Sequence, residues 1–167
     1  MHEKIEIRRA DIADVPTIAA FHVDVWREAY AGLMNRDFLE SLSVAQHEAE
    51  WSHALTEWPD YRTLVAHDEA GEFLGFGSVR EHVSIGPNSL ELHTLNLKPA
   101  ARGTGLSGRL MAELMGEREA FLWVVDGNHR AIDFYRRIGF ELTKERRPDA
   151  LAQVDDIRMV RRAPDVG

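Results

Sequence analysis

The segment from Ser89 to Gly108 constrains the fold of this chain most strongly, because it reads as a strand, a short loop and a glycine-rich helix start within twenty residues. Glycine lets the backbone approach a ligand closely, and the free N–H groups at a helix start attract anions. The segment therefore predicts a phosphate-binding turn between a strand and a helix. Its glycines, Gly103, Gly105 and Gly108, also spell G-x-G-x-x-G, which taken alone indicates a dinucleotide site.

Length and charge limit what the rest of the chain can be. The 167 residues are expected to form one domain, residues 1–167. Twenty Lys and Arg residues against 28 Asp and Glu give a net charge of -8, which argues against a nucleic-acid-binding surface. An anionic ligand therefore needs a local excess of positive charge.

Several kinds of site and location are disfavoured by composition. There is no cysteine, so a thiolate nucleophile, a disulfide and cysteine-ligated zinc are excluded. No metal is expected, because the histidines other than His93 have no recognised ligand spacing and read as surface or core positions; they are residues 2, 22, 47, 53, 67, 82 and 129. The apolar runs are too short to span a membrane, and the N-terminus is too charged for a secretory leader, so no membrane partner and a cytoplasmic location are expected.

The apolar pattern predicts a mostly helical first third followed by strands from Tyr61 onward. The expected strands cover residues 4–8, 63–67, 72–80, 90–97, 121–125, 141–145 and 154–160. The expected helices are one capped by Asp11 or Asp14, one through Phe38 and Leu42, one from Ser43 to before Pro59, one bearing Leu106, Leu110 and Leu114, and one over 128–138. Short turns at 68–71 and 86–88 favour an antiparallel meander, and the whole order implies a mixed sheet with helices on both faces.

A dinucleotide-binding fold is the second choice. In its favour, Asp126 ends the next strand 23 residues after Gly103, near where a ribose-binding acid is expected. Against it, the segment 98–102 separates the strand from the first glycine and brings a cation to the ligand. Only 41 residues follow Asp126, and the preceding strands form a meander, so further βα units have no room.

Three ordered blocks resemble the GNAT superfamily of acetyl-CoA-dependent N-acyltransferases. Its central signature, (Gln/Arg)-x-x-Gly-x-(Gly/Ala), reads here as residues 100–105, with Ala100 in place of Gln or Arg and an intact Arg-Gly-x-Gly core. Residues 122–140, ending in Gly139-Phe140, look like the fifth strand and fourth helix of the family, and residues 25–33 are similar to a block of its bacterial members. The resemblance spans nearly the whole chain.

The resemblance implies an α/β (α+β) fold of GNAT type. Such a fold has a mixed, mostly antiparallel sheet of about seven strands, about four flanking helices, and splayed fourth and fifth strands. It implies acetyl-CoA as the acyl donor, no metal, and a primary amine on a small molecule or peptide as the acceptor. A homodimer is common in the family.

The resemblance also implies which residues bind the cofactor. The backbone of Leu95, Asn96 and Leu97 pairs with the pantetheine arm as an added strand, and Asn128 contacts the same arm. The pyrophosphate is expected to lie against successive N–H groups of the glycine turn and helix start, namely Arg102, Gly103, Thr104, Gly105, Leu106 and Ser107.

Catalytic and substrate-binding residues follow from the same comparison. Tyr135 matches the tyrosine that faces the thioester sulfur, where a phenol can protonate the departing thiolate; the other interpretation is a core aromatic. Glu91 aligns with a strand-four glutamate that serves as base in several members, and His93 lies on the same strand face, so the base is one of these two. Trp26 and Tyr30 share one helix face and could form an aromatic wall for the acceptor, although Trp26 also suits core packing.

The predicted function is direct transfer of an acetyl group from acetyl-CoA to a primary amine in a ternary complex. The missing cysteine favours that direct route. Two alternatives stay open: an acyl-CoA-binding sensor without turnover, to which Ala100 gives some weight, and a nicotinamide-dependent oxidoreductase. The excess of acidic residues favours a cationic acceptor without selecting one.

Overall fold

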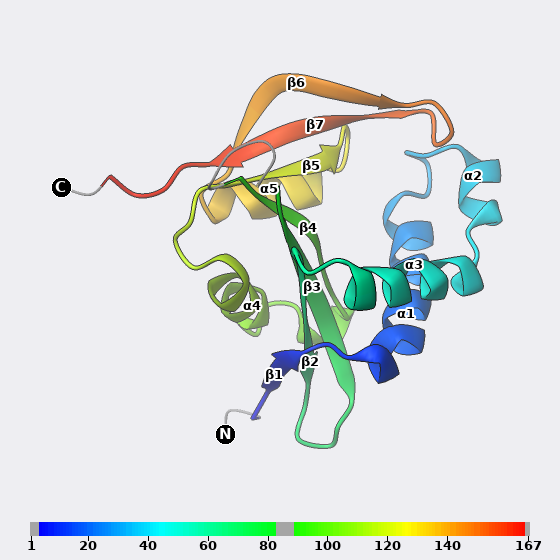
Figure 1. Ribbon diagram of the computed structural model, residues 1–167. Coiled ribbons are helices and arrows are strands. Elements are labelled where there is room, and N and C mark those ends of the chain that lie inside the picture. The colour runs from blue at the N-terminus through cyan, green and yellow to red at the C-terminus, as the bar shows by residue number, and fades with distance from the viewer. Residues whose placement is uncertain (1–3, 83–88, 166–167) are drawn as a thin grey trace.

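Seven strands form one open sheet in the computed structural model, which describes residues 4–82 and 89–165 (Figure 1). The strands are β1 (Glu6–Arg9), β2 (Tyr61–His67), β3 (Phe73–Glu81), β4 (Leu90–Leu97), β5 (Ala120–Val125), β6 (Glu141–Asp149) and β7 (Val154–Arg161). Their order in the sheet is β1-β2-β3-β4-β5-β7-β6, and within the described ranges only β4 and β5 run parallel. The mixed, mostly antiparallel sheet predicted from the sequence is therefore confirmed.

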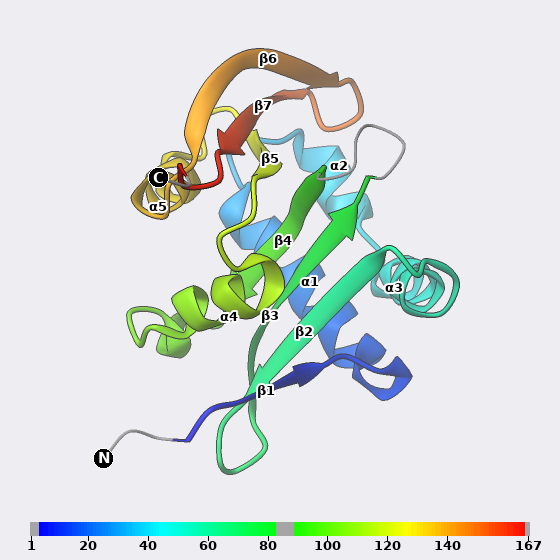
Figure 2. The same cartoon turned by 60° about the vertical axis from the view of Figure 1, so that its left-hand side comes forward.

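Helices cover both faces of this sheet (Figure 2). They are α1 (Val15–Ala29), α2 (Arg36–Ser41), α3 (Val44–Glu57), α4 (Leu106–Met115) and α5 (His129–Arg137). The described ranges thus hold five α-helices, as the apolar pattern predicts, whereas the resemblance implied about four. The predicted cap of the third helix is present, since the Gln46 N–H donates to the Ser43 hydroxyl at 3.3 Å.

Two hydrophobic cores hold the layers together. On one face, α4 inserts Leu106, Leu110 and Leu114 against the central strands, as its apolar spacing predicts. On the other face, Ile18 of α1 and Trp51 of α3 pack over β2 and β3. The core under α1 and α3 lies near β2 and β3, whereas the core under α4 extends to β5 and β7. β4 lies between these two regions of the sheet, where the strands diverge.

The splayed pair β4 and β5 is the feature that positions the site. Their register holds only at Leu90 with Ala120 and at Glu91 with Phe121, after which the strands separate. The pairing of β3 with β4 also shifts: Val79 faces Leu92 and Ser78 faces Thr94, which leaves His93 as the extra residue of a β-bulge. A bulge bends its strand and redirects a side chain, so β4 turns away from β5 at His93.

The sequence located most element boundaries within two residues, and β6 is the main exception. The expected strand over 141–145 runs on to Asp149, through Pro148. β6 pairs with β7 alone, so it is an edge strand, where proline and charged side chains are tolerated and no apolar alternation is required. The predicted turn at 86–88 and His2 lie outside the described residues. No helix in the described ranges is both long enough and apolar enough to cross a membrane.

Candidate active site

One cavity, here called the cofactor cavity, lies where β4 and α5 face each other and has a volume of about 290 Å³. Eight of the predicted cofactor-binding residues line it: Leu95, Asn96, Leu97, Arg102, Gly103, Ser107, Asn128 and Tyr135. They come from β4, the glycine turn, the start of α4 and the start and middle of α5. The other lining residues are Val25, Ala29, Arg130, Ala131, Phe134 and Arg137.

The cofactor cavity carries a positive charge in an acidic chain. Its described lining includes the arginines Arg102, Arg130 and Arg137 and no acidic side chain. Arg130 and Arg137 were not among the residues predicted from the sequence to line the site. Their spacing with Phe134 is the signal that was available, because positions i, i+4 and i+7 share one helix face. The cavity therefore has the local positive charge that a phosphate-bearing ligand needs in a chain of net charge -8.

The glycine turn adopts a backbone that other residues rarely accept. Gly103 has a φ of +75° and Gly105 a φ of +85°, and a Cβ at either position would meet nothing within 4 Å. Glycine is thus required there by backbone conformation and not by lack of space. The first helical hydrogen bond of α4 runs from the Arg109 N–H to the Gly105 carbonyl at 3.2 Å, so the preceding N–H groups of α4 are free to face an anion.

Three of the predicted turn residues do not line the cavity. The Thr104 hydroxyl donates to the Ala101 carbonyl at 2.6 Å, Gly105 is the N-cap of α4, and the side chain of Leu106 is fully buried in the core. One expectation is corrected: the Arg102 N–H donates to the Pro99 carbonyl at 3.2 Å. The Arg102 N–H is therefore already used within the turn, although Arg102 itself lines the cavity.

Tyr135 lies deep in the cofactor cavity. Burial is the main cause that raises the pKa of its phenol, and the nearby Tyr30 raises it further. Burial likewise raises the pKa of Tyr30, and the Asn128 side chain partly offsets that effect. Tyr135 is thus a neutral O–H donor at physiological pH, and Tyr30 and Asn128 are its neighbours. Within the described lining of either cavity Tyr30 does not appear.

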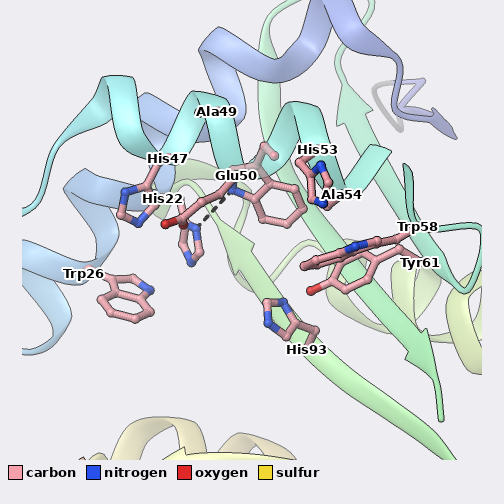
Figure 3. A pocket seen from close by; sticks show the side chains of 11 residues that line it. His22, Trp26, His47, Ala49, Glu50, His53, Ala54, Trp58, Tyr61 and His93 are labelled. Carbon is pink, nitrogen blue, oxygen red and sulfur yellow. Dashed lines mark hydrogen bonds between the residues drawn. The ribbon is translucent and has the colours of Figure 1, made fainter. Parts of the chain in front are cut away.

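A second cavity, here called the acceptor cavity, lies on the α1 and α3 side of the sheet and has a volume of about 620 Å³. Figure 3 shows His93 facing it from β4, with Trp26 at one side and Trp58 and Tyr61 at the other. The remaining lining residues come from α3 and, for His22, from α1; they are His22, His47, Ala49, Glu50, Trp51, His53 and Ala54.

Three histidines that the sequence assigns to surface or core positions also line this cavity. His22 is a buried position, and it lines the acceptor cavity together with His47, His53 and His93. His22 is buried, and that burial, followed by the charges of His47 and His93, lowers its pKa to about 3. Trp51 Nε1 donates to its Nδ1 at 3.4 Å, so His22 is a neutral imidazole. The i, i+4 spacing of His22 and Trp26 on α1 was the available signal.

Of the two candidate bases, His93 lines this cavity, whereas Glu91 is not among its described lining residues. The His93 side chain is exposed toward the cavity, but the protein around the ring removes part of its hydration. This desolvation lowers the pKa of His93, and the Glu91 carboxylate opposes part of that shift. The rings of His93 and Tyr61 lie 5.2 Å apart between centroids. Glu91 also contacts a second histidine, since Nε2 of His82 lies 2.5 Å from Oε2 of the Glu91 carboxylate. His82 was not among the predicted site residues.

The two cavities adjoin along the same two elements. On α1, His22 and Trp26 face the acceptor cavity, whereas Val25 and Ala29 face the cofactor cavity. On β4, His93 faces the first and the segment 95–97 faces the second. Trp26 also stacks edge-to-face on Tyr30, with 5.5 Å between ring centroids, and Tyr30 neighbours Tyr135. Tyr30 therefore links Trp26, in the lining of the acceptor cavity, to Tyr135, in the lining of the cofactor cavity.

Nothing in the described part of the chain brings three His, Asp or Glu side chains together in a way that could hold a metal ion.

Residues 27–140 match the family described as "Acetyltransferase (GNAT) family". The chain is 29% identical over 154 residues to the uncharacterized N-acetyltransferase YuaI of Bacillus subtilis (strain 168), covering 84% of this chain and 83% of that protein. It is 29% identical over 151 residues to an L-methionine sulfoximine/L-methionine sulfone acetyltransferase of Pseudomonas paraeruginosa, covering 82% and 80%. Among solved structures, the PaiA N-acetyltransferase of Thermoplasma acidophilum in complex with coenzyme A shares the fold, with a TM-score of 0.71, 23% identity and coverage of 95% and 99%.

Proposed function

The chain belongs to the GNAT acetyltransferase family and is an acyl-CoA-dependent acetyltransferase, and we propose that it transfers the acetyl group of acetyl-CoA to a primary amine by direct attack. In this proposal acetyl-CoA occupies the cofactor cavity while the amine occupies the acceptor cavity. The observation that carries it is the shared wall: α1 and β4 each contribute residues to both cavities. If these neighbouring cavities hold the amine next to the thioester, the two reactants react as if in one molecule, which supplies the larger part of the rate.

The cofactor cavity supplies the binding groups that acetyl-CoA requires. Arg102, Arg130 and Arg137 offer guanidinium groups to its phosphates, and the start of α4 offers free N–H groups. Beyond Glu91 the β4 edge is not paired with β5, so the backbone of the segment 95–97 is available to pair with the pantetheine amides. These contacts direct the thioester toward Tyr135.

The chemical step needs a proton acceptor for the amine and a proton donor for the thiol. A bond forms between the amine nitrogen and the acetyl carbon while the carbon–sulfur bond breaks. His93 or Glu91 takes the proton that the amine loses, and the Tyr135 phenol donates one to the leaving thiolate. The raised pKa of Tyr135 keeps its proton in place until sulfur carries charge. No acyl-cysteine intermediate is available, because the chain has no cysteine.

The test is release of free coenzyme A from acetyl-CoA with a panel of primary amines, with the products identified by mass spectrometry. We expect thiol release that depends on the amine and yields the N-acetylated product. Tight acetyl-CoA binding without turnover of any amine would contradict the proposal and favour an acyl-CoA sensor. Calorimetry should detect acetyl-CoA binding and no NADH binding; the reverse would favour a nicotinamide enzyme. A single domain over residues 1–167, a homodimer and a cytoplasmic location stay predictions from the sequence.

A further inference from the structure

The wall of the acceptor cavity is unusually specific in its chemistry, and from it we infer the substrate class: a primary amine on an apolar, aromatic body that carries no carboxylate. The inference rests on the proposed function, since it assigns the acceptor of that same reaction. It depends on three features of the cavity, namely its rings, its charges and the place of His93.

Aromatic rings supply most of the wall. Trp51 and Tyr61 are buried, each with 5% exposure, and form the inner side, whereas Trp58 is 37% exposed and stands at the rim. Trp26 closes the opposite side (Figure 3). Rings arranged in this way present both faces and edges, which favours an aromatic guest in edge-to-face contact over a long polar chain.

The charges of the cavity favour an ammonium group and disfavour a carboxylate. Among the described residues that line it there is no lysine or arginine, and Glu50 is the one carboxylate. His22 is neutral, because its pKa is about 3. A cationic amine is therefore attracted by Glu50 and by the π faces of tryptophan, while a carboxylate would lose its hydration without gaining a lysine or arginine partner.

Two arginines near His93 do not change this balance. Arg80 is paired with Asp60 at 3.1 Å and lies over the Trp58 ring at 5.0 Å. Arg147 is paired with Asp156 at 2.9 Å and lies over the Trp123 ring at 4.5 Å. Each guanidinium already has a carboxylate partner and an aromatic face, and neither lines the acceptor cavity. Neither is placed to bind the carboxylate of an amino acid substrate.

His93 fixes the end of the cavity at which the amine must lie. The bulge in β4 directs its imidazole into the cavity, next to the stretch of β4 that lines the cofactor cavity. The amine thus points toward His93, and the apolar body extends back between Trp26 and Trp58. An α-carboxylate on the carbon next to the amine would then lie beside His93, in a cavity whose described lining has no lysine or arginine to pair with it.

The decisive experiment compares amines that differ in one group. We expect kcat/KM for phenethylamine to exceed that for L-phenylalanine, which adds only a carboxylate, by at least about a hundredfold. L-Phenylalaninol, which has a neutral hydroxymethyl group there, should stay within about tenfold of phenethylamine. L-Methionine sulfone, the kind of substrate named for the Pseudomonas relative, and spermidine should both be poorer than phenethylamine.

The outcomes separate this inference from the proposed function. Turnover of L-phenylalanine, L-methionine sulfone or spermidine at least as efficient as that of phenethylamine would overturn the substrate class and leave the acetyltransferase activity intact. Release of no coenzyme A with any amine, despite acetyl-CoA binding, would overturn the proposed function itself.

A matched pair of variants tests the role of charge. Glu50→Gln removes the cavity carboxylate, and we expect the KM for phenethylamine to rise about threefold to tenfold with kcat nearly unchanged. Glu57→Gln makes the same change on α3 at an exposed position outside the cavity, and its KM should match the wild type. The Glu50→Gln effect should shrink in high salt. An unchanged KM in Glu50→Gln would show that Glu50 does not attract the amine.

Discussion

The cofactor cavity and the acceptor cavity share α1 and β4, yet they are built in opposite ways. The cofactor cavity depends largely on backbone, namely a glycine turn, the free N–H groups of a helix start and an unpaired strand edge, and three arginine side chains add positive charge. The acceptor cavity depends on side chains from α1, α3, β2 and β4 that meet only in the folded protein. The difference explains why one ligand follows from a short motif whereas the other requires the tertiary structure.

Replacing the same residue type in each cavity should give the largest contrast. Tyr135→Phe removes the phenol that protonates the leaving thiolate, so kcat should fall at least about a hundredfold while acetyl-CoA affinity is unchanged. Tyr61→Phe removes a buried hydroxyl beside His93. This hydroxyl has no assigned role in proton transfer, so kcat should stay within about threefold of the wild type. Steady-state kinetics and calorimetry measure the two quantities. Full turnover by Tyr135→Phe would remove this tyrosine from the mechanism and leave it a core aromatic.

The backbone dependence of the cofactor cavity can be tested with a pair of glycines. Gly105 and Gly71 have φ values of +85° and +81°, and neither has an atom within 4 Å of an added Cβ. Valine at either position forces the same backbone strain, so both variants should lose about 1–3 kcal/mol of stability. Only Gly105→Val should also weaken acetyl-CoA binding, by about tenfold, because only it redirects the N–H groups at the start of α4. Equal acetyl-CoA affinity in the two variants would show that the glycine turn and the N–H groups at the start of α4 do not hold the cofactor.

On the acceptor side, the candidate base should determine how kcat/KM depends on pH. Burial lowers the pKa of His93 below its usual 6.5, and the Glu91 carboxylate raises it in part. If His93 is the base, kcat/KM falls as the pH drops through that lowered pKa, because the protonated imidazole cannot accept a proton. Glu91→Gln removes the opposing charge, which lowers the pKa of His93 further and should move the acid limb to lower pH.

The alternative base gives the reverse pattern. His93→Ala should abolish the acid limb when His93 is the base, whereas loss of that limb in Glu91→Gln alone would identify Glu91. Profiles of kcat/KM against pH for the three proteins measure this directly.

The sequence predicted the cofactor side far better than the acceptor side, and the reasons are physical. Gly103, Gly105 and the α4 start are adjacent in the chain, so local geometry already fixes what they can bind. His22, His47 and His93 lie on three elements, and only the packing of α1 and α3 over β4 brings them together. The bulge at His93 left no pattern in the sequence either, because it appears only in the register of β3 with β4. The exposed edge strand β6 was underestimated for lack of apolar alternation.

Asn128 both caps a helix through local contacts and lines the cofactor cavity, so its variants give the most sensitive test of the comparison between local and tertiary structure. Its side chain accepts from the Ala131 N–H at 3.3 Å as the N-cap of α5, and it also lines the cofactor cavity. Asn128→Ala should cost about 1 kcal/mol of stability and weaken acetyl-CoA binding about twofold to threefold. Asn128→Asp keeps an acceptor for the cap but loses the amide donor, so stability should be retained while affinity falls as in Asn128→Ala. Urea unfolding and calorimetry separate the effects. Wild-type affinity in Asn128→Asp would mean that this residue only caps the helix, and that the pantetheine arm is held by the β4 backbone without it.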